Sequence, residues 1–378
     1  MKITSVEPLV VDIESRNWLF VVVGTDEGLT GVGEGSLPGH PLAVAAAVEE
    51  YREYLVGEDP ARIQHLWQVM YRRPFFRSGA VTLSAMSAVE QALWDIKGKV
   101  AGLPVYELLG GRCHDRIKLY VNGPSGATLE ELADSARSLV ERGFTAMKTG
   151  LELPVLPVQG DGIFRRAAQQ FEALREAVGE EVEIAWDAHG RLAPAMSIKL
   201  ARALEPYGVW FLEEPALPEN AKGLAQVARA TSVPVATGER LFTKWAFREV
   251  LELGAAALLQ PDLSHCGGVL EARAIASMAE VYYCGFAPHN PLGPVNTIVS
   301  AHVAAASPNF VALEICTYPP EWTRALVSEP VELADGYLEL SDAPGWGVEL
   351  DLELCRAHPY RPHALPARRH PSGAVADW

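Results

Sequence analysis

Three segments of similar pattern decide the fold: EIAWD at residues 183–187, VWFLE at 209–213 and VPVATGE at 233–239. Each is a short run of apolar and β-branched residues, which is typical of a buried strand, and each ends in an acidic residue. Asp187, Glu213 and Glu239 follow one another at intervals of 26 residues, the length of one strand plus one helix. The repeat predicts parallel strands joined by helices, with a carboxylate at the end of each strand.

The same rhythm continues on both sides of these segments. Amphipathic helical stretches separate the strands, for example at 129–142, 164–178, 195–204 and 269–279. Eight strands in strict alternation with helices favour a closed parallel barrel, with a doubly wound open sheet as the alternative. The predicted strands are Ile117–Asn122, Ala146–Thr149, Glu183–Asp187, Val209–Glu213, Val233–Thr237, Ala257–Asp262, Gly285–Pro288 and Val311–Ile315.

The flanking regions differ from the barrel repeat of residues 116–325. Residues 1–115 read as an α+β unit, with strands at Ile3–Ile13, Trp18–Thr25 and Leu29–Glu34 and helices at Leu42–Leu55, Ala61–Tyr71 and Ser84–Val100. Residues 326–378 are rich in turns and too numerous for a frayed tail, so we expect them to pack back on the N-terminal unit.

Composition excludes several classes of function. The 378 residues are 49% hydrophobic and 21% charged, which is typical of a folded globular protein. A net charge of −16 repels phosphate backbones and anionic lipids, so neither nucleic acid nor a membrane is an expected partner. The sequence lacks a signal peptide or membrane-spanning run, which predicts a cytoplasmic protein. We also expect a homo-oligomer, although the sequence does not set the number of subunits.

The glycine spacing of GVGEG at 31–35 faintly resembles a dinucleotide-binding loop. No helix follows it within a βαβ unit, so a strand with a bulge is the favoured interpretation. The five cysteines include no C-x-x-C pair, which argues against a disulfide framework and a structural zinc site. The sequence therefore gives no support for a dinucleotide or a structural zinc ion as cofactor.

In a βα barrel the chemistry lies where the strands end. Three carboxylates at one mouth repel one another unless a cation lies between them, and Mg²⁺ is the usual occupant of all-oxygen sites with open water positions. The alternative is that each acid simply caps a helix in its own loop. Three acids in succession, with His189 two residues after the first, favour a metal site at Asp187, Glu213 and Glu239.

Two further residues end neighbouring strands. Asp262 follows the sixth predicted strand and His289 follows the seventh. A carboxylate in this position can hold one imidazole nitrogen and leave the other as a base.

The order and spacing of these residues resemble the enolase superfamily, and within it the mandelate racemase-like group of acid-sugar dehydratases. The resemblance covers almost the whole chain. It rests on TDEG at 25–28, LWQVMY at 66–71, QALWDIKGK at 91–99, DAHGR at 187–191, EEP at 213–215, GER at 238–240, QPDLSH at 260–265 and APHNPLGP at 287–294.

The resemblance implies an α/β fold, a modified TIM barrel of the (β/α)7β type under an α+β capping domain. It implies Mg²⁺ on Asp187, Glu213 and Glu239, and a small-molecule acid sugar as substrate. The expected reaction dehydrates D-galactonate or a related aldonate to a 2-keto-3-deoxy acid through an enediolate.

The resemblance also assigns roles to single residues. His289, oriented by Asp262, is the expected base at the carbon next to the carboxylate, and His189 is the acid that protonates the departing 3-hydroxyl. Lys148 and Glu314 are expected to contact the substrate carboxylate and the enediolate. Further substrate contacts are expected from the cap loops, at Arg16, Trp18 and His40.

Some positions depart from the superfamily pattern. Many members carry Lys-x-Lys at the end of the second strand, where this chain has Lys148-Thr149-Gly150, and strand six ends in Gln260-Pro261-Asp262 without a lysine. A racemase or epimerase, which needs a base on each face of the carbon, is therefore the less favoured enzyme. A mannonate dehydratase is disfavoured because the loop at 151–157 lacks an Arg/Tyr pair. The non-enzyme alternative is a metal-binding relic, against which the intact set of acids and histidines argues.

Overall fold

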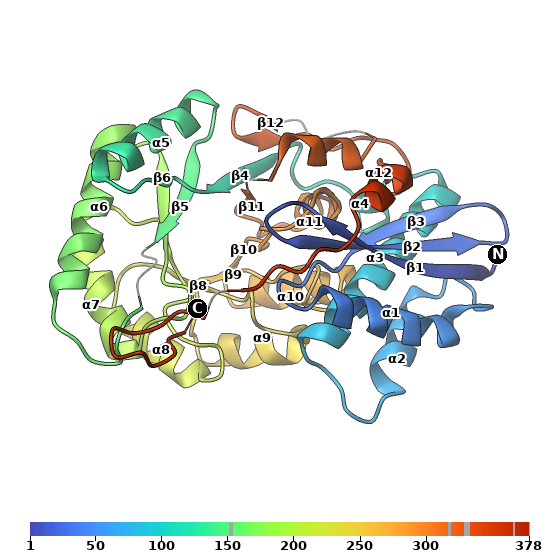
Figure 1. The fold of residues 1–378 in the computed structure, drawn as a ribbon, viewed down its shortest axis with the longest axis horizontal. Helices are drawn as coiled ribbons and strands as arrows, with labels where there is room; N and C mark the ends of the chain where they lie inside the picture. Colours follow the sequence, from blue (N-terminus) through green and yellow to red (C-terminus); the bar gives the residue numbers. More distant parts are fainter. Residues whose placement is uncertain (151–153, 317–318, 329–332, 366, 378) are drawn as a thin grey trace.

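Figure 1 shows the computed structural model, which describes residues 1–377 apart from 151–153, 317–318, 329–332 and 366. A smaller α+β part, the cap, lies beside a barrel. The cap sheet is antiparallel with the order β1-β2-β3, and its predicted strands and helices are confirmed. The cap consists of β1 (Ile3–Asp12), β2 (Asn17–Thr25), β3 (Thr30–Glu34), α1 (Pro41–Leu55), α2 (Ile63–Arg72), α3 (Ala80–Ala101) and α4 (Val105–Leu108).

Strand β3 packs on α3 through direct backbone contact. Gly31 and Gly33 alternate along the strand and Gly35 follows it directly, so all three face the helix. A Cβ atom at Gly33 would lie 2.0 Å from the carbonyl oxygen of Ala88, and one at Gly31 would lie 2.1 Å from that of Ala92. The pairing of β3 with β2 is regular, so the expected strand is confirmed and its expected bulge is wrong. The glycine spacing serves strand-to-helix packing and not a dinucleotide.

Gly33→Ala should therefore destabilise the protein by about 1–3 kcal/mol, because the added methyl group forces the strand away from α3. Urea denaturation followed by circular dichroism measures the loss. Gly160→Ala is the matched control, since no heavy atom lies within 4 Å of the added Cβ there. An equal effect of the two substitutions would contradict the packing argument.

The barrel alternates strands and helices in the predicted order, and neighbouring strands are parallel. Its elements are β4 (Ile117–Asn122), α5 (Leu129–Glu141), β5 (Ala146–Gly150), α6 (Gly162–Val178), β6 (Glu183–Asp187), α7 (Pro194–Leu204), the 3-10 turn η1 (Glu205–Tyr207), β7 (Leu212–Glu213), α8 (Ala221–Arg229), β8 (Val235–Thr237), α9 (Thr243–Glu252), β9 (Leu258–Leu259), α10 (Val269–Val281), β10 (Gly285–Phe286), α11 (Pro294–Ala305) and β11 (Leu313–Cys316). This is the (β/α)7β pattern.

The last strand closes the barrel. Strand β11 pairs in parallel with β4, and a parallel bridge between Phe286 and Phe310 joins the segment before β11 to β10. The closed barrel is confirmed and the open doubly wound sheet is wrong. Each of the eight strand segments contributes one residue to a separate core cluster: Tyr120, Ala146, Ala185, Phe211, Ala236, Leu258, Ala287 and Ala312. The small side chains in this set fit the narrow barrel interior.

The C-terminal segment contacts both parts of the molecule. Trp346 is buried against the cap, and its Nε1 donates to the carbonyl oxygens of Val32 and Gln91 at 3.1 and 3.2 Å. Residue Leu338 pairs antiparallel with Ile117 at the start of the barrel. The described elements of this region are η2 (Glu321–Leu326), β12 (Leu333–Ala334), β13 (Tyr337–Leu338) and α12 (Leu352–Ala357).

None of the described helices is both long and apolar enough to cross a membrane. The cysteines are free thiols, and Cys266, Cys284 and Cys355 are buried.

Candidate active site

The carboxyl ends of neighbouring strands bring acidic side chains to one edge of the barrel. Asp187 pairs in register with Glu213, and Glu213 pairs with Ala236 on the next strand. Glu239 follows two residues after the end of β8. The three predicted metal ligands therefore lie on three adjacent strands at the same mouth.

Lys148, in the middle of β5, lies among these acids. Its Nζ is 2.5 Å from Glu213 Oε1, 2.9 Å from Glu314 Oε1 and 3.8 Å from Asp187 Oδ2. Burial alone would lower the pKa of Lys148, but the charges of Glu213 and Glu314 outweigh it and raise the pKa well above its ordinary value. Lys148 is therefore a fixed cation below the mouth, with only 2% of its side chain exposed.

Glu213 has a second set of contacts that sequence analysis did not identify. Gln260 Nε2 donates to Glu213 Oε2 at 2.7 Å and to the hydroxyl of Tyr120 at 3.2 Å. Burial and the neighbouring carboxylates raise the pKa of Glu213 well above its ordinary value, against the charge of Lys148. A polar residue directly after the apolar run of β9 was the signal that could have identified Gln260.

Asp187 and His189 form a compact pair. Asp187 Oδ1 accepts the backbone N–H of His189 at 2.7 Å, and Asp187 Oδ2 lies 3.1 Å from His189 Nδ1. His189 has a φ of 54°, a left-handed conformation that is uncommon for a residue other than glycine. Burial alone would raise the pKa of Asp187, but Lys148 and His189 hold it below its ordinary range.

His289 and Asp262 also lie together. Strands β9 and β10 are neighbours, and a parallel bridge joins Asp262 to His289 directly. His289 Nδ1 is 2.8 Å from Asp262 Oδ2, while Nε2 is 3.3 Å from Glu239 Oε2 and 3.8 Å from Glu314 Oε2. Burial alone would lower the pKa of His289, but the surrounding carboxylates outweigh it and raise the pKa to about 10.

The two histidines lie on opposite sides of the mouth. His189 follows β6 and His289 follows β10. In the closed ring, three strands separate β6 from β10 in one direction and three in the other. A small molecule bound between them would therefore meet one imidazole on each side.

The acids suit a hard cation. Asp187, Glu213 and Glu239 offer only oxygen atoms, which Mg²⁺ prefers. Glu239 Oε2 is buried and, although His289 Nε2 lies 3.3 Å away, it accepts no hydrogen bond from the described residues. Among those residues no three side chains are gathered closely enough to hold a metal as they stand, because the carboxylates turn toward Lys148, His189 and His289. The donor set fits a divalent cation that would draw the three carboxylates together.

Two family profiles match the chain. The N-terminal domain of the mandelate racemase / muconate lactonizing enzyme family matches residues 3–110, and the profile described as enolase C-terminal domain-like matches residues 131–354. The chain belongs to the enolase superfamily. The first match covers the cap, and the second covers the barrel from α5 to the C-terminal segment.

Relatives in the superfamily match the full length of the chain. It is 41% identical over 372 residues to a D-galactonate dehydratase of Xanthomonas euvesicatoria pv. vesicatoria, covering 96% of each chain. It is 40% identical over 388 residues to a D-galactonate dehydratase of Variovorax paradoxus, covering 100% of each. The crystal structure of an enolase from Agrobacterium radiobacter with bound sodium and L-malate superposes with a TM-score of 0.93 at 34% identity, covering 100% of each chain.

The structure gives a physical reason for one departure from the superfamily pattern. The second lysine of Lys-x-Lys would stand at Gly150, where a Cβ atom would lie 2.4 Å from the backbone oxygen of Asp187. No side chain fits at this position unless the backbone moves. The chain therefore has no room for a lysine base next to Lys148.

The predicted cap contacts lie in different environments. Trp18 was expected both to begin a strand and to contact the substrate from a cap loop. The strand is confirmed, since Trp18 lies in β2, where only 2% of it is exposed. The apolar run of residues 18–23 extends the strand over this tryptophan and draws it into the cap core. Its Nε1 N–H donates no hydrogen bond to the described residues. Arg16 precedes β2 and is half-buried, and His40 is exposed just before α1.

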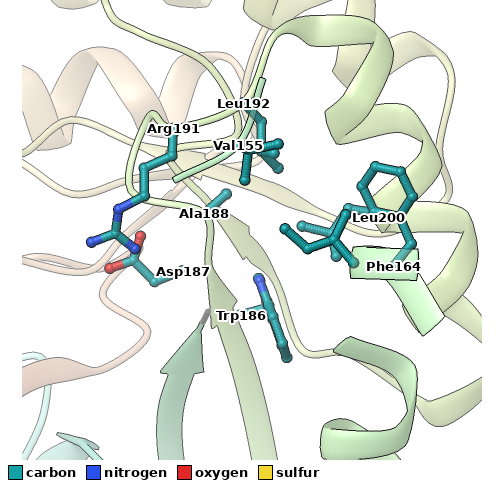
Figure 2. A pocket seen from close by; sticks show the side chains of 9 residues that line it. Val155, Phe164, Trp186, Asp187, Ala188, Arg191, Leu192 and Leu200 are labelled. Carbon is teal, nitrogen blue, oxygen red and sulfur yellow. The ribbon is translucent and has the colours of Figure 1, made fainter. Parts of the chain in front are cut away.

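A small cavity beside Asp187 is not suited to a sugar acid. Its volume is about 20 Å³, and Figure 2 shows Arg191 turned toward the Asp187 carboxylate at one end of it. The rest of the lining is apolar: Val155, Ile163, Phe164, Trp186, Ala188, Leu192 and Leu200. A polyhydroxylated ligand would lose its hydrogen bonds to water there.

The disfavoured mannonate dehydratase motif concerns the loop at 151–157, of which residues 151–153 lie outside the described part of the chain.

Proposed function

We propose that the chain is a magnesium-dependent acid-sugar dehydratase that converts D-galactonate or a related aldonate into a 2-keto-3-deoxy acid. The observation that carries the proposal is the 2.8 Å contact between His289 Nδ1 and Asp262 Oδ2. It holds Nδ1, so that Nε2 faces the acids and is the nitrogen that accepts a proton when the ring is neutral. The name D-galactonate dehydratase on full-length relatives supports the substrate class.

His289 is the proposed base. It removes the proton from C2, and the electron pair of the broken C–H bond moves into the substrate carboxylate to form an enediolate. Asp262 fixes the imidazole and stabilises its protonated form. His289 accepts the proton in its neutral form. A cation held by Glu239 would favour that form, because it would offset the negative charge that Glu239 places near Nε2.

His189 is the proposed acid on the opposite side of the mouth. It donates a proton to the 3-hydroxyl as the C3–O bond breaks, so that water leaves and the electrons of the enediolate form the C2–C3 double bond. The resulting enol takes up a proton at C3 and loses the proton of its C2 hydroxyl, which gives the 2-keto-3-deoxy acid. Acid and base on opposite sides can act on adjacent carbons of one bound substrate.

Asp187, Glu213 and Glu239 are the proposed ligands of Mg²⁺. The cation, when bound, supplies positive charge that stabilises the enediolate. Lys148 and Glu314 are proposed to contact the substrate carboxylate and the enediolate. Lys148 is already held by Glu213 and Glu314, so its charge is fixed in position before the substrate binds.

Arg16, Trp18 and His40 are the proposed substrate contacts from the cap. Arg16 and His40 reach solvent, whereas Trp18 is limited to its buried indole N–H, since the ring itself belongs to the cap core. Their side chains would act on the distal end of the substrate.

A racemase or epimerase is the second candidate on this scaffold. His189 could in principle serve as the base on the second face, but the lack of space at Gly150 removes the lysine that such enzymes of the superfamily use. The intact dyad of His289 and Asp262 argues against a metal-binding relic.

Purified protein with Mg²⁺ and a panel of aldonic and aldaric acids should produce a 2-keto-3-deoxy acid from D-galactonate or a close stereoisomer. A colorimetric keto-acid assay followed by mass spectrometry detects a loss of one water molecule. Inversion of the substrate without loss of water would favour the racemase, and no turnover of any acid would favour the relic.

A further inference from the structure

Glu34 reaches from the cap into the barrel. It is the last residue of β3, and its side chain is completely buried. Glu34 Oε1 accepts the backbone N–H of Gly293 at 2.7 Å, and Oε2 accepts that of Asn296 at 2.9 Å. These two residues form the start of α11, the helix that follows His289.

Helix α11 has no N-cap side chain of its own. Its N-cap is Gly293, and the first N–H groups of any helix lack partners within the helix. The carboxylate of Glu34 takes the place of that missing cap, at the positive end of the helix dipole. A residue of the cap thereby fixes where α11 begins.

The start of α11 is connected to the residue after His289 by a side-chain hydrogen bond. Asn296 Nδ2 donates to Asn290 Oδ1 at 3.0 Å, and Asn290 is the residue directly after His289. The backbone N–H of Asn290 in turn donates to Glu314 Oε2 at 3.3 Å. The position of the imidazole thus depends on the position of the helix start.

Glu34 is also tied to the loop of Asp262. Ser264 Oγ donates to the backbone oxygen of Glu34 at 2.9 Å, and the Ser264 N–H donates to Asp262 Oδ1 at 2.8 Å. The loop is held along its length by a stripe of buried side chains on α3, namely Ser84, Ser87, Glu90 and Gln91. Glu34 therefore contacts both loops.

We propose that Glu34 is a positioning residue that holds His289 and Asp262 in register with each other. The inference rests on the proposed function, because it assigns His289 as the base. It predicts that a change at Glu34 lowers the rate of proton removal from bound substrate more than it lowers substrate affinity.

Glu34→Gln should lower kcat by about 10- to 100-fold with a change in KM of less than about threefold, because a base misplaced by a fraction of an ångström loses rate in the bound complex. The amide keeps one acceptor oxygen but turns an NH₂ group toward a backbone N–H of α11. Steady-state kinetics with the acid sugar found in the panel measures the split between kcat and KM.

Gly293→Ala tests the same contact from the barrel side. A Cβ atom at Gly293 would lie 2.7 Å from both carboxylate oxygens of Glu34, so the carboxylate must move away from α11. The backbone of Gly293, with φ of −86° and ψ of 180°, accepts alanine without strain. This variant should reproduce the kinetic defect of Glu34→Gln, and it decides the matter if Glu34→Gln fails to fold.

Asp95→Asn is the matched control. Asp95 is an equally buried cap acid that accepts the backbone N–H groups of Val32 and Trp346, at 3.1 and 2.9 Å, and touches neither loop. Asp95→Asn should lower the midpoint temperature of thermal unfolding and leave kcat within about threefold of wild type. If Glu34→Gln and Gly293→Ala lower kcat no more than Asp95→Asn does, the positioning role is wrong.

A second readout does not depend on turnover. The His289 ring signal, in protein labelled at histidine Cε1 and assigned by its loss in His289→Asn, should shift in Glu34→Gln and Gly293→Ala but not in Asp95→Asn. An unchanged signal in the first two variants would overturn the positioning role. Wild-type protein that turns over no acid would overturn the proposed function alone, since the ring signal still tests the role of Glu34.

Discussion

His289→Asn should lower both deuterium uptake at C2 and dehydration by about 100- to 10,000-fold, because a positioned base contributes a factor of this size. His189→Asn should behave differently. Without the acid the enediolate still forms and collapses back, so substrate in D₂O should gain deuterium at C2 while little keto acid appears. This result requires that the proton on His289 exchanges with solvent before it returns. NMR of the C2 position measures both reactions.

His65→Asn, an exposed histidine on α2, is the control for this pair and should leave both rates unchanged. Deuterium uptake in His289→Asn with none in His189→Asn would mean that base and acid are assigned the wrong way round. Equal loss of exchange in both variants would show that His189 also takes part in proton removal.

Removal of divalent metal with EDTA should abolish dehydration, and added Mg²⁺ should restore it. The reason is electrostatic: Asp187, Glu213 and Glu314 surround one fixed cation, Lys148, and Glu239 lies beside His289. An enediolate formed among these acids without further positive charge is strongly disfavoured. Glu239→Gln should lose both activity and Mg²⁺ binding measured by isothermal titration calorimetry.

Glu219→Gln provides the comparison, because Glu219 is exposed on the loop after β7 and lies outside the acid cluster. It should bind Mg²⁺ as the wild type does. Full activity after verified metal removal, or unchanged Mg²⁺ binding in Glu239→Gln, would overturn the metal site.

The sequence was sufficient for those parts of the site that repeat with the barrel. Parallel strands end at one edge, so the acids at Asp187 and Glu213 could be placed side by side from their spacing alone, and register pairing confirms it. The same reasoning placed Asp262 beside His289. These positions follow from local strand patterns and a single topological rule.

The sequence was not sufficient for contacts between regions far apart in the chain. Nothing in the pattern of β3 indicates that Glu34 would cap a helix that starts at residue 294. From the sequence, Gln260 showed only that strand six lacks a lysine. Its hydrogen bond to Glu213 depends on how closely the strands approach, which the sequence does not reveal. Trp18 was assigned as a substrate contact although it begins a predicted strand, and the sequence pattern did not show that its ring packs into the cap core.

The attachment of the cap has a consequence for how such enzymes diverge. The hydrogen bonds that join α3 and β3 to the loops of Asp262 and His289 come from Ser84, Ser87, Glu90, Gln91 and Glu34. None of these residues lies in the segments that carry Arg16 or His40. Mutations in those segments can change which sugar is accepted without breaking the hydrogen bonds that position Asp262 and His289. Evolution can thus exchange the substrate while it preserves the chemistry.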